Sequence, residues 1–127
     1  MTRSKSGLAL AILTLLCGQS AISSAKAQSP FDGLWSVLIL TEQGACDRGY
    51  RYAVRIKGGL VRHADPANSA FQISGRVSGS GAINVRVARG SQSANGKGRI
   101  NRSRATGQWK SAKGECAGSW QAERRGN

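Results

Sequence analysis

Few side chains in this 127-residue sequence have the types and spacing that acid–base or nucleophilic chemistry requires. His63 is the single histidine, and Asp65 follows it two positions later, next to Pro66. A catalytic base must be positioned against a nucleophile and an orienting group, and no serine or cysteine stands in a recognisable arrangement with this pair. We therefore interpret His63 as a solvated residue at the end of a strand, and we expect no catalytic residues and a protein that is not an enzyme.

Metal and phosphate sites are not indicated either. One histidine without a Cys-x-x-Cys or His-x-x-x-His spacing gives too few ligands for a metal centre. The glycine-rich segment 95–99 (NGKGR) lacks the P-loop pattern GxxxxGK followed by Ser or Thr, and no helical pattern follows it. We expect no metal and no cofactor. Asp32 and Asp47 are expected to accept hydrogen bonds only from nearby backbone groups, as turn residues do.

The first 27 residues have the composition of a secretory signal peptide. They combine a basic start, an apolar run of 11 residues from Gly7 to Cys17, and a small-x-small cleavage pattern at 25–27. The apolar run is shorter than the roughly 20 residues that span a bilayer. We therefore expect a single periplasmic or secreted domain of residues 28–127, with no transmembrane segment once residues 1–27 are removed.

Two cysteines remain after the signal. Cys17 is expected to leave with it, because Leu16 stands where lipoprotein processing requires a small residue. A domain of about 100 residues has a small core and gains from a covalent cross-link. An even number of cysteines in an oxidising compartment pairs most simply within the chain. We therefore expect a disulfide between Cys46 and Cys116.

Apolar and polar residues alternate with a period of two along the expected domain, and no window shows the spacing of an amphipathic helix. The pattern predicts an all-β fold of eight strands, at 33–41, 50–57, 60–64, 70–78, 82–89, 91–100, 104–111 and 115–124. Short links rich in Gly, Asn and Asp make neighbouring strands antiparallel. Such a meander loses its exposed edges by closing into a small up-and-down barrel. The expected disulfide fits this closure, although an open two-layer sandwich also accommodates it.

The apolar face of each strand should point into the barrel. Six large aromatic residues belong to this inward set: Trp35, Tyr50, Tyr52, Phe71, Trp109 and Trp120. Inward glycines and alanines alternate with them, including Gly75, Ala94, Gly96, Gly98, Gly107 and Gly118. Small residues facing large ones are the pattern by which a narrow barrel fills its own interior, and the sequence leaves open whether a cavity remains.

Positive charge is the strongest compositional signal, with 19 Lys and Arg against six Asp and Glu. Nine basic residues stand at outward positions of successive strands: Arg51, Arg55, Lys57, Arg62, Arg76, Arg86, Lys97, Arg99 and Lys110. Such a surface favours an anionic polymer, lipopolysaccharide or a partner protein, or it serves solubility alone. No outward aromatic residues stand between these charges, which argues against single-stranded nucleic acid. Binding would also not depend on a nucleic-acid sequence.

The first expected strand differs from the strands with basic outward positions, because it is apolar on both faces. Leu34, Leu38 and Leu40 form its outward row. An outward aliphatic row is typical of a contact site. We therefore expect self-association or a partner protein at this row.

The motif Gly-x-Trp occurs three times, at 33–35, 107–109 and 118–120. The first copy resembles the start of the calycin barrels, the lipocalin and avidin group, in which a basic residue of the last strand packs across this Trp. The resemblance implies that Arg124 is the basic partner of Trp35. The segments FDGLW, CDRGYRY and CAGSWQAERR are also similar to small exported bacterial proteins of unassigned function.

These observations favour a non-enzymatic exported barrel that binds an anionic envelope component or a partner protein through its basic outer face. The calycin resemblance implies an alternative, a carrier of a small apolar ligand. A further alternative is an inhibitor of an exported hydrolase, acting through the segment Glu42–Gly49 that contains Cys46. The barrel interior distinguishes the carrier from the surface functions, since ligand pockets commonly measure about 300–1,000 Å³.

Overall fold

The computed structural model describes residues 2, 17, 18 and 29–127. The signal peptide predicted over residues 1–27 therefore lies outside the described residues, apart from Thr2, Cys17 and Gly18.

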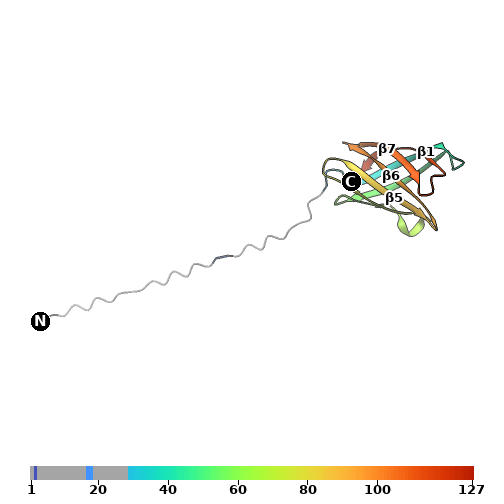
Figure 1. Ribbon diagram of the computed structural model, residues 1–127. Helices are drawn as coiled ribbons and strands as arrows, with labels where there is room; N and C mark the ends of the chain where they lie inside the picture. The colour runs from blue at the N-terminus through green and yellow to red at the C-terminus, as the bar shows by residue number, and fades with distance from the viewer. Residues whose placement is uncertain (1, 3–16, 19–28) are drawn as a thin grey trace.

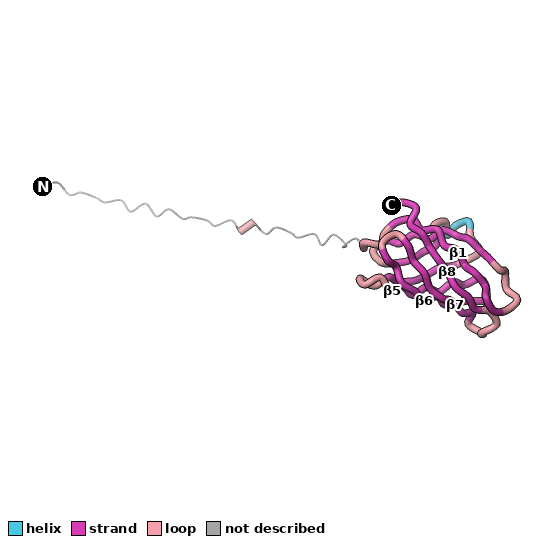
Figure 2. Tube along the Cα trace, turned by 90° about the horizontal axis from the view of Figure 1, so that it is seen from above, coloured by secondary structure: helices cyan, strands magenta, loops and turns pink. Residues whose placement is uncertain are grey.

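Eight antiparallel strands close into a barrel in chain order, which confirms the predicted meander (Figure 1). The elements are β1 (Gly33–Gln43), β2 (Gly49–Lys57), β3 (Leu60–His63), a 3₁₀ turn η1 (Pro66–Asn68), β4 (Gln72–Val77), β5 (Ala82–Arg89), β6 (Gln92–Asn101), β7 (Arg104–Ser111) and β8 (Ala117–Gly126). β1 pairs with both β2 and β8, and the second pairing closes the sheet. Figure 2 shows β1 and β8 side by side, followed by β7, β6 and β5.

Two strands begin two residues later than the sequence pattern predicts, because serine hydroxyls accept hydrogen bonds from the backbone N–H groups just before these strands. The Phe71 N–H donates to the Ser69 hydroxyl at 3.0 Å, so β4 begins at Gln72 rather than at residue 70. The Cys116 N–H donates to the Ser111 hydroxyl at 3.0 Å, so β8 begins at residue 117 rather than 115.

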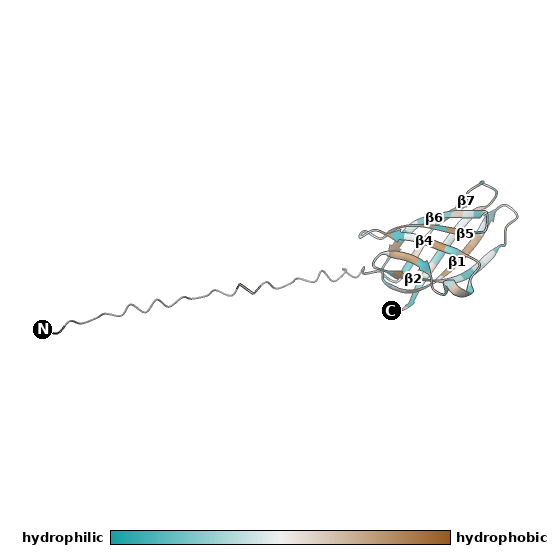
Figure 3. Cartoon of the chain, turned by 90° about the horizontal axis from the view of Figure 1, so that it is seen from below, coloured by the Kyte–Doolittle hydropathy of each residue, from teal (hydrophilic) through white to brown (hydrophobic). Residues whose placement is uncertain are grey.

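We name the two ends of the barrel by the loops that they carry. The base carries residues 29–32 and the turns 58–59, 78–81 and 102–103. The mouth carries the loops 44–48, 64–71, 90–91 and 112–116. Between the two ends, teal and brown residues alternate along the strands in Figure 3, as expected for walls with one polar and one apolar face.

The buried core is built around two interlocked Gly-x-Trp motifs on β7 and β8. The strand register places Gly107 opposite Trp120 and Trp109 opposite Gly118. Gly107 leaves room for the Trp120 indole, whereas a Cβ atom on Gly118 would meet the Leu40 backbone of β1. A Cβ atom added to Gly107 would lie 2.5 Å from the Trp120 ring. These glycines are therefore required by close packing rather than by a turn.

Residues before β1 cross the base and close it. Trp35, only 1% exposed, donates its Nε1–H to the Phe31 carbonyl at 2.9 Å. The Arg124 guanidinium lies over the Trp35 ring, 5.1 Å from its centroid, and donates to the carbonyls of Pro30 at 2.8 Å and Arg102 at 3.3 Å. The basic residue that the Gly-x-Trp motif points to is thus in contact with Trp35.

Asp32 adds a second connection at the base. Its carboxylate accepts hydrogen bonds from the backbone N–H groups of Gly58 at 2.9 Å and Gly59 at 3.4 Å. The expectation of purely local bonds for Asp32 was wrong, because barrel closure brings the β2–β3 turn next to the residue that precedes β1.

Candidate functional site

A cavity of about 900 Å³ occupies the barrel interior. All four mouth loops contribute lining residues and none of the base turns does, so the cavity opens at the mouth. Its deep part is lined by Trp35, Ile56, Val61, Ile83, Ile100 and Ala105, and its outer part by Tyr50, Tyr52, His63, Phe71, Arg89 and Trp109. The side chains therefore close the base of the barrel and leave a cavity above it, which answers a question that the sequence pattern left open.

The inward row of β6 shows why the barrel is hollow toward the mouth. A Cβ atom added to Gly98 would lie 2.5 Å from the Trp120 ring, whereas one added to Gly96 would have its nearest neighbour, the Trp120 Nε1 atom, at 3.4 Å. Ala94, the next inward residue, also lines the cavity. In a ring of eight strands β6 lies opposite β2. Small residues on one wall thus face the large residues of the other.

Four rings on the opposite side of the cavity form what we call the aromatic wall, namely Tyr50, Tyr52, His63 and Phe71. The ring centroids of Tyr50 and Phe71 lie 5.1 Å apart, and those of Tyr50 and Tyr52 lie 5.9 Å apart. Tyr50 is 40% exposed, which is unusual for a large ring and places it at the mouth. The aromatic wall therefore extends from the interior to solvent.

His63 belongs to this wall: it ends β3, as predicted, and its side chain lines the cavity. Its ring stacks on Tyr52 with centroids 6.4 Å apart and an interplanar angle of 20°. The Nδ1 atom accepts a hydrogen bond from the Asp65 backbone N–H at 2.9 Å. This bond assigns the ring proton to Nε2 in the neutral form. His63 stands two residues after the buried Val61, so the period of two pointed to an inward position.

Tyr52 lines the cavity as a neutral phenol across the physiological pH range. Burial, and secondly the neighbouring Tyr50, raises the pKa of the Tyr52 hydroxyl to about 12. The cavity therefore carries no tyrosinate charge near neutral pH, which suits an apolar or hydrogen-bonding ligand.

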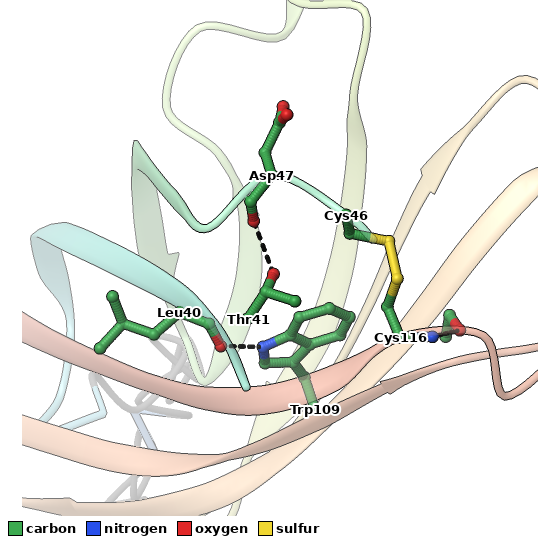
Figure 4. The surroundings of a disulfide bond; sticks show 7 residues. Leu40, Thr41, Cys46, Asp47, Trp109 and Cys116 are labelled. Atoms are coloured by element: carbon green, nitrogen blue, oxygen red, sulfur yellow. Dashed lines mark hydrogen bonds between the residues drawn. A yellow bond between two sulfur atoms is a disulfide. The ribbon is translucent and has the colours of Figure 1, made fainter. Parts of the chain in front are cut away.

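The predicted Cys46–Cys116 disulfide is present and ties the β1–β2 loop to the start of β8 at the mouth (Figure 4). Beside it, the Trp109 Nε1–H donates to the Leu40 carbonyl at 3.0 Å and the Thr41 hydroxyl donates to the Asp47 carbonyl at 2.6 Å. These links hold the rim of the cavity on the side of β1, β7 and β8.

The nine basic residues predicted on the outer surface are all exposed. Strands β2 to β7 contain no Asp or Glu, so their outer wall is charged with one sign only. The mouth is different, because Arg51, Arg89 and Lys113 line the cavity there together with Asp47, Asp65 and Glu115. Positive potential is therefore a property of the wall rather than of the cavity entrance.

Arg89 is a site residue that sequence reasoning missed. It follows Ile83, Val85 and Val87 at the same spacing of two and ends the inward row of β5. Its guanidinium lies over the Phe71 ring, 5.4 Å from the centroid. The period-two pattern of β5 is the signal that could have assigned Arg89 to the cavity.

The outward leucines of β1 lie on the wall beside basic and polar neighbours. Leu40 is 37% exposed, while Leu34 and Leu38 are half-buried. Leu34 pairs with Arg55 and Leu38 with Arg51. Self-association through this row stays a prediction, which light scattering of wild type and Leu38→Lys would test.

No family model, curated protein or solved structure matches this chain. Within the part of the chain that the structure describes, no group of His, Cys, Asp and Glu could hold a metal ion. In that same part, no helix has the length and apolar character needed to cross a membrane.

Proposed function

We propose that this protein is an exported carrier that holds a small, mainly apolar molecule inside the barrel. The cavity of about 900 Å³ carries this proposal, since binding sites for small molecules commonly measure about 300–1,000 Å³ and combine apolar walls with a few polar groups. The disulfide supports export, because such bonds persist in oxidising compartments. The Gly-x-Trp resemblance to carrier barrels points in the same direction.

Binding of a neutral dye, N-phenyl-1-naphthylamine, tests this function. Mature wild-type protein should bind one equivalent and increase the emission of the dye, with little dependence on salt. Ala94→Trp places an indole in the cavity and should weaken binding at least tenfold. Gln108→Trp adds the same side chain at an exposed position of β7 and should leave binding unchanged. Unchanged binding by Ala94→Trp, with the fold verified by circular dichroism, would contradict the proposal.

The acid-free outer wall of β2 to β7 supports a second candidate function, which is binding of an anionic polymer such as heparin or lipopolysaccharide. Arg55, Arg62 and Arg86 are exposed on three of these strands, and the register places Arg55 directly beside Arg62. Each neutralised anionic group would release counterions, so the affinity should fall steeply with added salt.

Two triple variants test whether the wall is the binding surface. Reversal of Arg55, Arg76 and Arg86 to Glu should weaken heparin binding far more than reversal of three basic residues near the barrel ends: Arg48, Lys113 and Arg125. Both variants change the net charge equally. Equal losses would mean that only net charge matters, and would remove the wall as a specific surface.

A further inference from the structure

The aromatic wall and the small residues of β6 enclose a space that suits a flat molecule. The wall contributes four ring systems from β2, β3 and the loop before β4. Opposite it, Ala94 and Gly96 bring no side chain larger than a methyl group into the cavity. A planar ligand between them could contact ring faces on one side and lie close to backbone on the other.

Arg89 provides a positive charge at the open edge of this space. Among the described residues, both ion pairs involve Glu123, so no carboxylate lies within 4.0 Å of the Arg89 guanidinium. The nearby Asp65 carboxylate accepts hydrogen bonds from the Asn68 side chain instead. The other charged lining residues are Arg51, Lys113, Asp47 and Glu115, and the Arg51 guanidinium donates to the Ser36 hydroxyl at 3.0 Å. Since these charges are mixed, selection of an anion depends on Arg89 itself.

On the basis of the proposed carrier function, we propose that the ligand class is a planar aromatic carboxylate. Its ring system lies in the cavity between Tyr52 and Ala94, and its carboxylate pairs with Arg89 at the mouth. Arg guanidinium groups bind carboxylates through paired hydrogen bonds. Aromatic rings favour offset or edge-on packing against other rings. A saturated chain would fill the apolar deep half but would leave the faces of the aromatic wall without this packing.

Three probes of graded chemistry test the proposal by displacement of N-phenyl-1-naphthylamine. They are naphthalene-2-carboxylate, the neutral aromatic naphthalen-2-ol and the saturated anion decanoate. The carboxylate should bind about tenfold more tightly than the naphthol, because a hydrogen bond to a charged group contributes about that factor. It should also bind more tightly than decanoate. Decanoate binding as tightly as naphthalene-2-carboxylate would overturn the aromatic part of the proposal.

Variants on β5 separate the role of charge from that of structure. Arg89→Gln should weaken binding of naphthalene-2-carboxylate about tenfold and leave naphthalen-2-ol unchanged. Arg86→Gln, on the exposed face of the same strand, should change neither. Equal losses of affinity for both probes in Arg89→Gln would show that Arg89 only stabilises the structure of the mouth. That result would overturn its role as the partner of the anion.

Phe71→Leu tests the ring contacts independently of Arg89 binding to an anion. The substitution should weaken binding of both aromatic probes several-fold and leave decanoate binding unchanged. An equal loss of affinity for all three probes would contradict stacking of the ligand against the aromatic wall. A different result would contradict the carrier function itself: wild-type protein that binds neither the dye nor any of the three probes.

Discussion

The base and the mouth belong to the same eight strands but are held in different ways. At the base, the chain before β1 crosses the barrel, and Trp35, Arg124 and Asp32 connect it to β8 and to the β2–β3 turn through hydrogen bonds and ring stacking. At the mouth, a disulfide and the indole of Trp109 hold one side of an open cavity. Packing therefore stabilises one end, while the other end keeps its interior available to a ligand.

The largest difference between the ends should appear when their tryptophans are removed. Trp35→Ala deletes a fully buried ring and its hydrogen bond to Phe31, and should reduce the free energy of unfolding by about 3–5 kcal/mol. Trp109→Ala removes a partly buried ring from the cavity wall. It should reduce the free energy of unfolding by less than half of that amount. Chemical denaturation followed by circular dichroism measures both. Equal losses would show that the mouth is packed as tightly as the base.

Removal of the disulfide should have the next largest effect. The bond joins residues 70 positions apart, and replacement of both Cys46 and Cys116 by Ser should lower the free energy of unfolding by about 2–4 kcal/mol. Dye binding should weaken as well, because the bond holds the rim of the cavity. A variant as stable as the oxidised wild type would show that the β1–β2 loop is held by its other contacts.

A glycine pair on β6 compares the two halves within one strand. Gly98→Ala brings a methyl group within 2.5 Å of the Trp120 ring and should cost about 1–3 kcal/mol through overpacking. Gly96→Ala meets its nearest atom at 3.4 Å and should change stability by no more than about 0.5 kcal/mol. Thermal unfolding of the two variants distinguishes them. A larger loss of stability for Gly96→Ala than for Gly98→Ala would show that the barrel is narrower toward the mouth than toward the base.

The smallest effect should appear only at alkaline pH. Burial raises the pKa of Tyr52 to about 12, above the usual value of about 10, so the folded protein retains this proton longer than the unfolded chain. The contribution of Tyr52 to stability should therefore be fully present below about pH 10 and decrease as the pH rises to about 12. Ultraviolet titration of tyrosinate should show a step near pH 12 that Tyr52→Phe lacks. Ionisation of Tyr52 with the ordinary pKa of about 10 would contradict its burial.

Much of the fold could be predicted because its signals are local. Alternation with a period of two, glycine-rich turns and two cysteines were sufficient for eight strands, barrel closure and the disulfide. The cavity could not be predicted, because its size depends on how far Trp120 and the other inward side chains reach across the barrel. The bonds of Asp32 depend on barrel closure, which brings the β2–β3 turn beside it. The inward positions of His63 and Arg89 follow from the same period of two as the neighbouring apolar residues, so these two could have been predicted.

The location of a bound aromatic carboxylate would show whether the barrel interior or the outer wall is the binding site. Crystals of residues 28–127 soaked with 6-bromo-naphthalene-2-carboxylate would reveal the bromine by its anomalous scattering. We expect one bromine site inside the barrel between Tyr52 and Ala94, with the carboxylate beside Arg89. A bromine site only on the outer wall beside Arg55 or Arg86, or a cavity without ligand in protein that binds the compound in solution, would contradict binding inside the barrel.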